Sequence, residues 1–330
     1  MREKRPPKEQ VSTTAAARWK PSRRQFLGNC AAGGLVAAGL AVSEAEGFAR
    51  EKPMENWVDA HVHVWTPDTN AYPLAGGYTV EGMKPPSFTP EQLFSHCRPH
   101  GVGRIVLIQM SFYGFDNSYM LDMMKRHRGV FGGVAVIDEN DQPERTMRQM
   151  ARRGVRGFRI RPVDFKPGRW LDRPPMQAMW ETGAREGLAM CHLVNPEYLP
   201  EMDRMCEKHP DTPVVIDHFA RIGISGQVQQ QDLDNLCRLA RHRNVSVKVS
   251  AYYALGKKQA PYLDLLPMIR RLLDSFGPER LMWASDGPFQ VVGGHEYGPS
   301  IDLIKEKADF LSDGDRAWLL ARTAEKIFYH

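Results

Sequence analysis

Two histidines and an aspartate alternate along a short apolar run: Asp59-x-His61-x-His63, followed by Trp65. On a β-strand, residues two apart point to the same side, so these four side chains are expected to share one face. Two imidazoles placed in this way can bind one metal ion together or can donate two hydrogen bonds to a substrate oxygen. The pattern therefore predicts a catalytic or metal site at the end of this strand.

A carboxylate and a third imidazole end two other apolar runs. Asp286 follows the run LMWAS, in which the small Ala284 stands two residues earlier. A carboxylate in such a position suits a general base held by a histidine, a metal ion or water, whereas the alternative is an aspartate that caps the turn before Gly287-Pro288. His218 ends the run VVID and is the candidate third imidazole of the same site.

The candidate metal ligands overlap with the candidate catalytic residues. His192 lies inside the apolar run LAMCHLV, where a histidine is as often a packed core residue as a ligand, so its role as an additional metal ligand stays open. One divalent ion, Zn²⁺ or Mn²⁺, would suit the set, and metal-free catalysis stays open as well. The catalytic candidates are Asp286, His61, His63 and His218, and the metal candidates are His61, His63, Asp286 and His192.

Cationic side chains alternate on two further runs. Arg159 and Arg161 share a face of one predicted strand, and Lys248 shares a face of another with Ser250. Cations near a substrate site usually bind carboxylate or phosphate groups. For Lys248, an equally good interpretation is that its side chain faces the surrounding helices. Because the run with Arg159 offers no lysine or glutamate to bridge two metal ions, we expect at most one ion per chain.

The elements that must position these residues alternate between β-rich and helical segments. Helical stretches, several ending in a glycine such as Gly187 or Gly277, separate the β-rich runs. Eight β-α units in about 280 residues predict a closed (β/α)₈ TIM barrel, an α/β fold, whereas a doubly wound sheet would normally show a Gly-rich phosphate loop after its first strand. The predicted strands lie near 57–65, 104–110, 130–137, 155–162, 188–194, 213–219, 245–252 and 281–288.

One connection is unusually long for this pattern. The segment 66–88, rich in Pro, Gly and Tyr, follows the first predicted strand directly after the histidine pair. Loops of this length without regular structure are commonly functional. We therefore expect it to overhang the site.

Residues 1–49 resemble a twin-arginine export signal, and residues 50–330 form the predicted barrel domain. Arg23-Arg24 precedes a short Ala- and Gly-rich apolar stretch that is too short and too Gly-diluted for a stable membrane span. Eight of the 44 basic and four of the 39 acidic side chains fall in this leader, so the remaining chain is close to neutral. We expect the twin-arginine export machinery as a partner, a periplasmic or extracellular location, and no nucleic-acid partner, since nucleic acid requires a concentrated cationic face.

The ordered set of motifs is similar to the amidohydrolase-related family, in particular its fuconolactonase-like and pyrone-dicarboxylate-lactonase-like branch. The motifs include DAHVHVW at 59–65, QMSFYGFDN at 109–117, IDH at 216–218, VKVS at 247–250 and WASDGP at 283–288. The resemblance implies a catalytic group of His61, His63, His218 and Asp286. It also implies substrate contacts at Ser111 and Arg159, and Tyr113 of the same motif is a further candidate. Ala220 stands where the family more often has glycine, so the loop after His218 is expected to differ.

These features together predict a hydrolase that opens a lactone or related cyclic ester of a small carboxylated substrate derived from a sugar acid or an aromatic compound. Asp286 would take the proton from the attacking water. Two rivals remain at this point: a metal-dependent decarboxylase on the same barrel, and an exported barrel that binds or isomerises a sugar. The sequence leaves open whether the chain forms a homo-oligomer, because fold and site class do not determine assembly.

Overall fold

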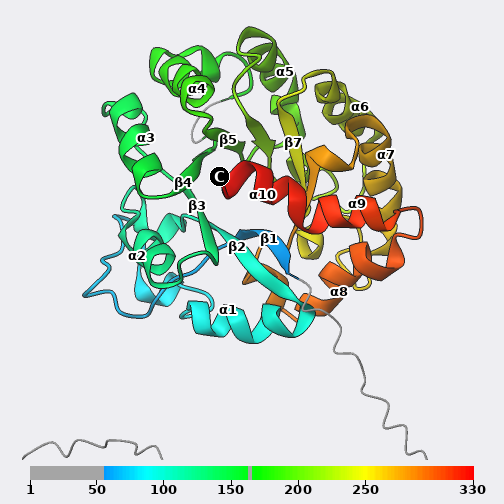
Figure 1. The fold of residues 1–330 in the computed structure, drawn as a ribbon, viewed down its shortest axis with the longest axis horizontal. Coiled ribbons are helices and arrows are strands. Elements are labelled where there is room, and N and C mark those ends of the chain that lie inside the picture. Colours follow the sequence, from blue (N-terminus) through cyan, green and yellow to red (C-terminus); the bar gives the residue numbers. More distant parts are fainter. Residues whose placement is uncertain (1–55, 163–165) are drawn as a thin grey trace, which may run out of the picture. The chain divides into compact units, whose positions relative to one another are not determined.

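The computed structural model describes residues 56–162 and 166–330, so the predicted leader at 1–49 lies outside the described residues. Eight strands follow one another in chain order around a single sheet, and each is parallel to the next (Figure 1). They are β1 (Trp57–Val62), β2 (Val102–Ile108), β3 (Phe131–Ala135), β4 (Val155–Ile160), β5 (Ala189–His192), β6 (Val214–Ile216), β7 (Val245–Ser250) and β8 (Leu281–Ala284).

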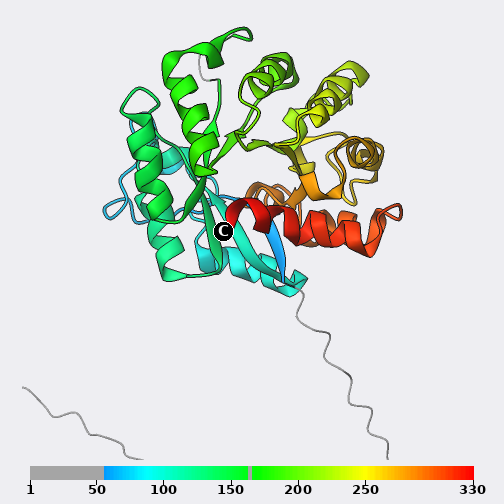
Figure 2. The same ribbon diagram turned by 45° about the horizontal axis from the view of Figure 1, so that its top comes forward.

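Helices lie outside the ring of strands, as the alternating pattern predicts (Figures 1 and 2). Gly187 ends α4 with a φ of 65°, a left-handed conformation that glycine adopts without a steric penalty. The helices are α1 (Pro90–Cys97), α2 (Ser118–Arg126), α3 (Pro143–Arg152), α4 (Pro174–Glu186), α5 (Leu199–Lys208), α6 (Gln230–Arg238), α7 (Leu266–Phe276), α8 (Tyr297–Asp302), α9 (Asp313–Ala317) and α10 (Thr323–Phe328).

Backbone contacts between the last and first strands close the barrel. Val62 forms a parallel bridge with Gly287, the amide of Asp286 donates to the His61 carbonyl at 2.9 Å, and the amide of His63 donates to the Gly287 carbonyl at 2.8 Å. The predicted TIM barrel is therefore confirmed. The same contacts hold the two most reactive segments of the sequence side by side.

The inside of the barrel is apolar at the end opposite the histidines. Val58, Val106 and Met282 pack there with Phe328 of α10, which crosses this end of the ring (Figure 1). A larger apolar cluster fills the space between the strands and the surrounding helices. Because α10 covers the amino ends of the strands, the carboxyl ends remain for a site, as in other barrels of this kind. Among the described residues, no helix is long and apolar enough to cross a membrane.

Candidate active site

A β-bulge in β1 decides which side chains reach the site. Asp59 pairs with Ile105 of β2, and Val62 pairs with Leu107. The step is three residues along β1 but only two along β2. The extra residue breaks the simple alternation. The prediction that Asp59 shares a face with His61 and His63 is therefore wrong.

Asp59 instead fastens β1 to β8 and α8. Its carboxylate accepts hydrogen bonds from the Ser285 amide at 2.9 Å and from the Tyr297 hydroxyl at 2.7 Å. Burial raises its pKa to about 6, against the effect of these hydrogen bonds. Trp65 also leaves the predicted face, because the chain departs from the sheet after β1 and the Trp65 indole donates to the Pro85 carbonyl at 3.0 Å.

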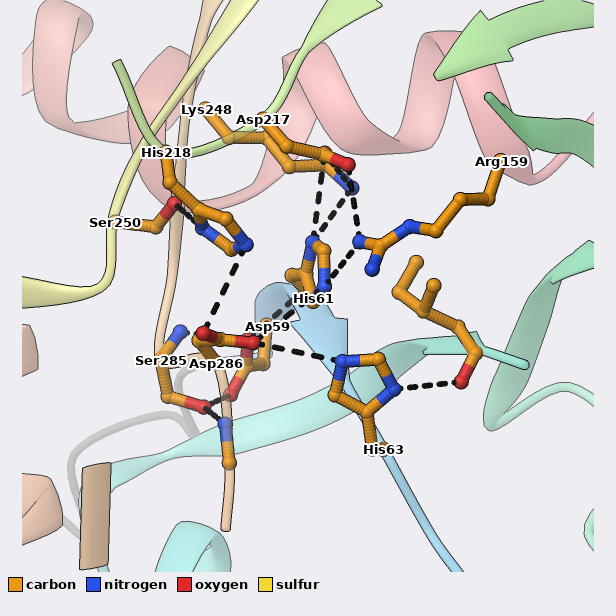
Figure 3. A network of polar contacts seen from close by, with 12 residues as sticks. Asp59, His61, His63, Arg159, Asp217, His218, Lys248, Ser250, Ser285 and Asp286 are labelled. Carbon is orange, nitrogen blue, oxygen red and sulfur yellow. Dashed lines mark hydrogen bonds and ion pairs between the residues drawn. The ribbon is translucent and has the colours of Figure 1, made fainter. Parts of the chain in front are cut away.

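Asp286 lies at the centre of three imidazoles (Figure 3). Its Oδ1 is 3.5 Å from Nε2 of His61 and 3.6 Å from Nε2 of His63, and its Oδ2 is 3.7 Å from Nε2 of His218. The Tyr253 hydroxyl donates a hydrogen bond of 2.7 Å to Oδ2. The structure thus brings all four predicted catalytic residues together, from β1 and from the segments after β6 and β8.

Two of these residues have an unusual backbone conformation. The φ angles of His218 and Asp286 are 53° and 65°, in the left-handed region that non-glycine residues enter at a cost. Such strained residues cluster at functional sites, where the surrounding structure holds them in place. The conformation aims both side chains at the same point above the ends of the strands.

Hydrogen bonds on the far sides of the rings fix how the histidines face Asp286. Nδ1 of His63 donates to the Ile108 carbonyl at 3.0 Å, which leaves Nε2 as the nitrogen that faces Asp286. Nδ1 of His218 lies 2.8 Å from the Ser250 hydroxyl. This is the arrangement by which proteins orient imidazoles for metal binding or proton transfer.

An ion cluster of the buried Asp217 and Lys248 with the partly buried Arg159 supports His61. Asp217 accepts from Arg159 at 3.0 Å and lies 3.0 Å from Nζ of Lys248, while Nδ1 of His61 is 3.4 Å from its Oδ1. Burial opposes the charge of Asp217, but Lys248, His61 and Arg159 hold its pKa well below the usual range. Arg159 also reaches the site itself, since its Nη2 donates to Nε2 of His61 at 2.8 Å.

The electrostatics keep the carboxylate charged and two of the imidazoles neutral. Burial alone would raise the pKa of Asp286, but the neighbouring imidazoles, His218 first and then His63 and His61, more than offset it and hold the pKa below its usual range. Burial, followed by Lys248, lowers the pKa of His61 far below its ordinary value, and burial also lowers that of His218. Asp286 is therefore a carboxylate at neutral pH, as a general base must be.

His61, His63 and Asp286 form a group that fits one divalent metal ion. Their ligand atoms all lie within 4.8 Å of one another, and this is the one such group among the described residues. Oδ1 of Asp286 is buried and has no hydrogen-bond partner in the described chain. Two nitrogens and one carboxylate oxygen are a common catalytic zinc set. The Arg159 guanidinium lies on the same side of His61 and donates to its Nε2, so a metal ion bound by this nitrogen would take the place of that hydrogen bond.

A cavity of about 490 Å³ opens above this group. The predicted catalytic and substrate residues on its wall are His63, Ser111, Arg159, Arg161, His218 and Asp286. Ala75 and Tyr78 of the long segment 66–88 also line it, so the expectation that this segment overhangs the site is confirmed. The carbonyl Oε1 of Gln109, buried and without a partner in the described chain, adds a hydrogen-bond acceptor to the wall.

Four candidate residues do not line the cavity, and the first of them is His61, which is completely buried against Asp286. Lys248 is completely buried against Asp217, and the Tyr113 hydroxyl accepts from the Thr66 amide at 3.1 Å. His192 lies with its ring 5.4 Å from that of Trp180, away from the metal group. Its side chain points to the helical layer because β5 places Cys191, the neighbouring residue, among the residues inside the barrel.

Two residues that the structure places at the site carry no recognisable functional signal in the sequence. Asp217 precedes His218 and looked like part of an apolar strand, although a carboxylate in such a strand signals a buried cationic partner. Tyr253 follows β7 without any motif of its own. The parallel pairing of β7 with β8 brings the ends of these strands side by side and places the Tyr253 hydroxyl on Asp286.

Comparisons with known proteins identify the family of the chain. The family described as amidohydrolase matches residues 58–329. An L-fucono-1,5-lactonase of Burkholderia ambifaria is 29% identical over 276 residues, which cover 79% of this chain and 91% of that protein. A 2-pyrone-4,6-dicarboxylate hydrolase of Comamonas testosteroni is 31% identical over 262 residues, which cover 75% of this chain and 82% of that protein.

A solved structure resembles the barrel over nearly its whole length. It is an amidohydrolase from Burkholderia multivorans with bound zinc, and it superposes with a TM-score of 0.70 at 22% sequence identity. The match covers 82% of this chain and 98% of that one. At this identity the likeness shows the fold.

Proposed function

The chain belongs to the amidohydrolase family and is a hydrolytic enzyme, and we propose that it opens the lactone ring of a small carboxylated substrate. One observation carries the proposal most directly: Asp286, a charged and buried carboxylate, faces a cavity in which Arg159 and Arg161 stand ready to bind an anionic group. The relatives that match over most of their length are named as lactone hydrolases, which supports the same reaction.

In the proposed reaction, Asp286 acts as the general base. It accepts a proton from a water molecule, whose oxygen forms a bond to the lactone carbonyl carbon. Arg159 and the imidazoles of His63 and His218 lie within reach of the negative charge that develops on the carbonyl oxygen and stabilise it. The ring carbon–oxygen bond then breaks, and Asp286 returns the proton to the leaving oxygen to give a hydroxy acid.

The chain's own residues also prepare the base. Tyr253 fixes Oδ2 of Asp286, so that Oδ1, which lacks a hydrogen bond in the described chain, is the oxygen that meets the water. Ser250 and the Ile108 carbonyl hold the rings of His218 and His63 in their orientations. A divalent ion held by His61, His63 and Asp286 would lower the pKa of water and polarise the carbonyl.

The test compares the wild-type enzyme with Asp286→Asn on a panel of sugar-acid and aromatic-derived lactones, followed by acid release. Asparagine keeps the volume of the side chain and tolerates the left-handed backbone at this position, where φ is 65°, so the variant should fold. Loss of a general base typically costs about 10²- to 10⁴-fold in rate. Near-normal turnover by the variant would refute the role of Asp286. Carbon dioxide as the product would show a decarboxylase instead.

A further inference from the structure

The mouth of the cavity carries an unusual set of exposed apolar side chains. Within residues 56–162 and 166–330, seven large hydrophobic side chains are exposed. Three of them, Tyr78, Phe115 and Ile224, line this same cavity, and the side chain of Phe115 is 60% exposed. Single exposed hydrophobics are ordinary, but a group of them gathered at one opening marks a binding surface.

The two most exposed aromatic rings at the mouth are carried by a well-fixed pair of loops. Tyr78 lies on the segment 66–88, and its ring packs edge-on against Phe112 at 5.6 Å between ring centres. The amide of Ala75 donates to the Phe112 carbonyl at 2.8 Å, which joins this segment to the loop after β2 that carries Phe115. The apolar side of the mouth is thus preorganised for contact with a ligand.

Charge occupies other parts of the same wall. Arg159 and Arg161 project from β4 and its end, and Arg221 lines the cavity from the loop after β6. Asp286 is the one carboxylate among the lining residues. A ligand that fills this cavity therefore meets cations in one part and aromatic rings in another.

We propose that the substrate is a carboxylated lactone with an aryl or other large apolar substituent, which lies against Tyr78 and Phe115 at the mouth. The inference rests on the proposed lactone hydrolysis and extends it to the substrate class. Tyr78 and Phe115 line the same cavity as Asp286, and a cavity of about 490 Å³ is of the size that holds a drug-sized ligand. Because the rings and the catalytic carboxylate line one cavity, the substrate itself, and not a protein partner, is the molecule that we expect to cover these rings.

The experiment uses paraconic acid, a carboxylated γ-butyrolactone, and its phenyl-substituted derivative. Turnover of both is measured, together with the dissociation constants of the two corresponding γ-lactams, which report binding without depending on ester hydrolysis. We expect the phenyl group to improve lactam binding and kcat/KM on the order of tenfold, as burial of an aromatic ring against others does. Phe115→Ser should reduce the phenyl preference, measured as the ratio of the two kcat/KM values and of the two lactam dissociation constants, to near one.

Leu263→Ser is the matched control, because Leu263 is similarly exposed and lies away from the cavity. It should leave the phenyl preference intact. Equal binding of the two lactams, or binding of neither, overturns the inference. A change in oligomeric state in Phe115→Ser without a change in lactam preference also overturns it, since the rings would then cover a second copy of the chain. Phenyl-dependent lactam binding without hydrolysis of either lactone would refute only the proposed reaction.

Discussion

Acidification should destabilise this protein through His192, and replacement of His192 by leucine should remove that effect. His192 is completely buried, and neither ring nitrogen has a hydrogen-bond partner in the described chain. Burial lowers its pKa to about 3. The native state therefore keeps this imidazole neutral at pH values where the unfolded chain protonates it.

The magnitude follows from the difference in bound protons. Because the folded pKa of His192 is the lower one, its unfavourable contribution is absent above the ordinary pKa of about 6.5 and grows as the pH falls toward the folded value. At pH 5 the native ring is still neutral, so the loss of unfolding free energy depends only on the pKa of His192 in the unfolded chain. This loss is about 2 kcal/mol relative to pH 8.

Urea unfolding of the wild type and of His192→Leu at pH 8 and pH 5 measures this contribution. Other buried histidines, such as His61 and His218, titrate alike in both proteins, so the comparison isolates His192. We expect the free energy of unfolding to fall about 2 kcal/mol less in the variant between the two pH values. Replacement of the exposed His96 by leucine is the matched control, because it makes the same substitution and leaves His192 in place.

The opposite result has a clear meaning. If wild type and His192→Leu lose the same free energy on acidification, then His192 is protonated or well solvated in the native protein, and the reasoning fails. The same variant also tests the open metal role of His192. The position of the ring beside Trp180 leads us to expect an unchanged metal content by elemental analysis.

Three further outcomes are expected. Lys248→Met should destabilise the fold by roughly 3–5 kcal/mol because it leaves Asp217 without one of its buried cations. The double variant with Asp217→Asn should lose less stability in urea unfolding than the sum of the two single variants, and additive losses would contradict the ion cluster. Ala220 has a φ of 54°, so Ala220→Gly should cost about 1–2 kcal/mol less in thermal unfolding than Ala135→Gly in β3, and equal costs would argue against the left-handed turn. Replacement of Arg23 and Arg24 by lysines should abolish export in a fractionation assay, and continued export would refute the interpretation of residues 1–49 as an export signal.

Local patterns in the sequence were enough to predict the barrel and the centre of the site. Strand and helix periodicity, together with glycines such as Gly187 that end helices, depend on neighbours along the chain, so eight β-α units could be counted before any contact was known. Parallel strands in a barrel all end at the same side. His61, His63, His218 and Asp286 were therefore expected to meet, and they do.

Which way the other side chains point was decided by the tertiary structure. The bulge in β1 exists only relative to β2, and it sends Asp59 to Ser285 and Tyr297 instead of into the site. The ion cluster of Lys248 and Asp217 requires β6 and β7 to lie side by side. Register between strands and closure of the ring are long-range properties, and the direction of each side chain depends on both. For this reason the sequence could predict the catalytic group but not the residues that hold it in place.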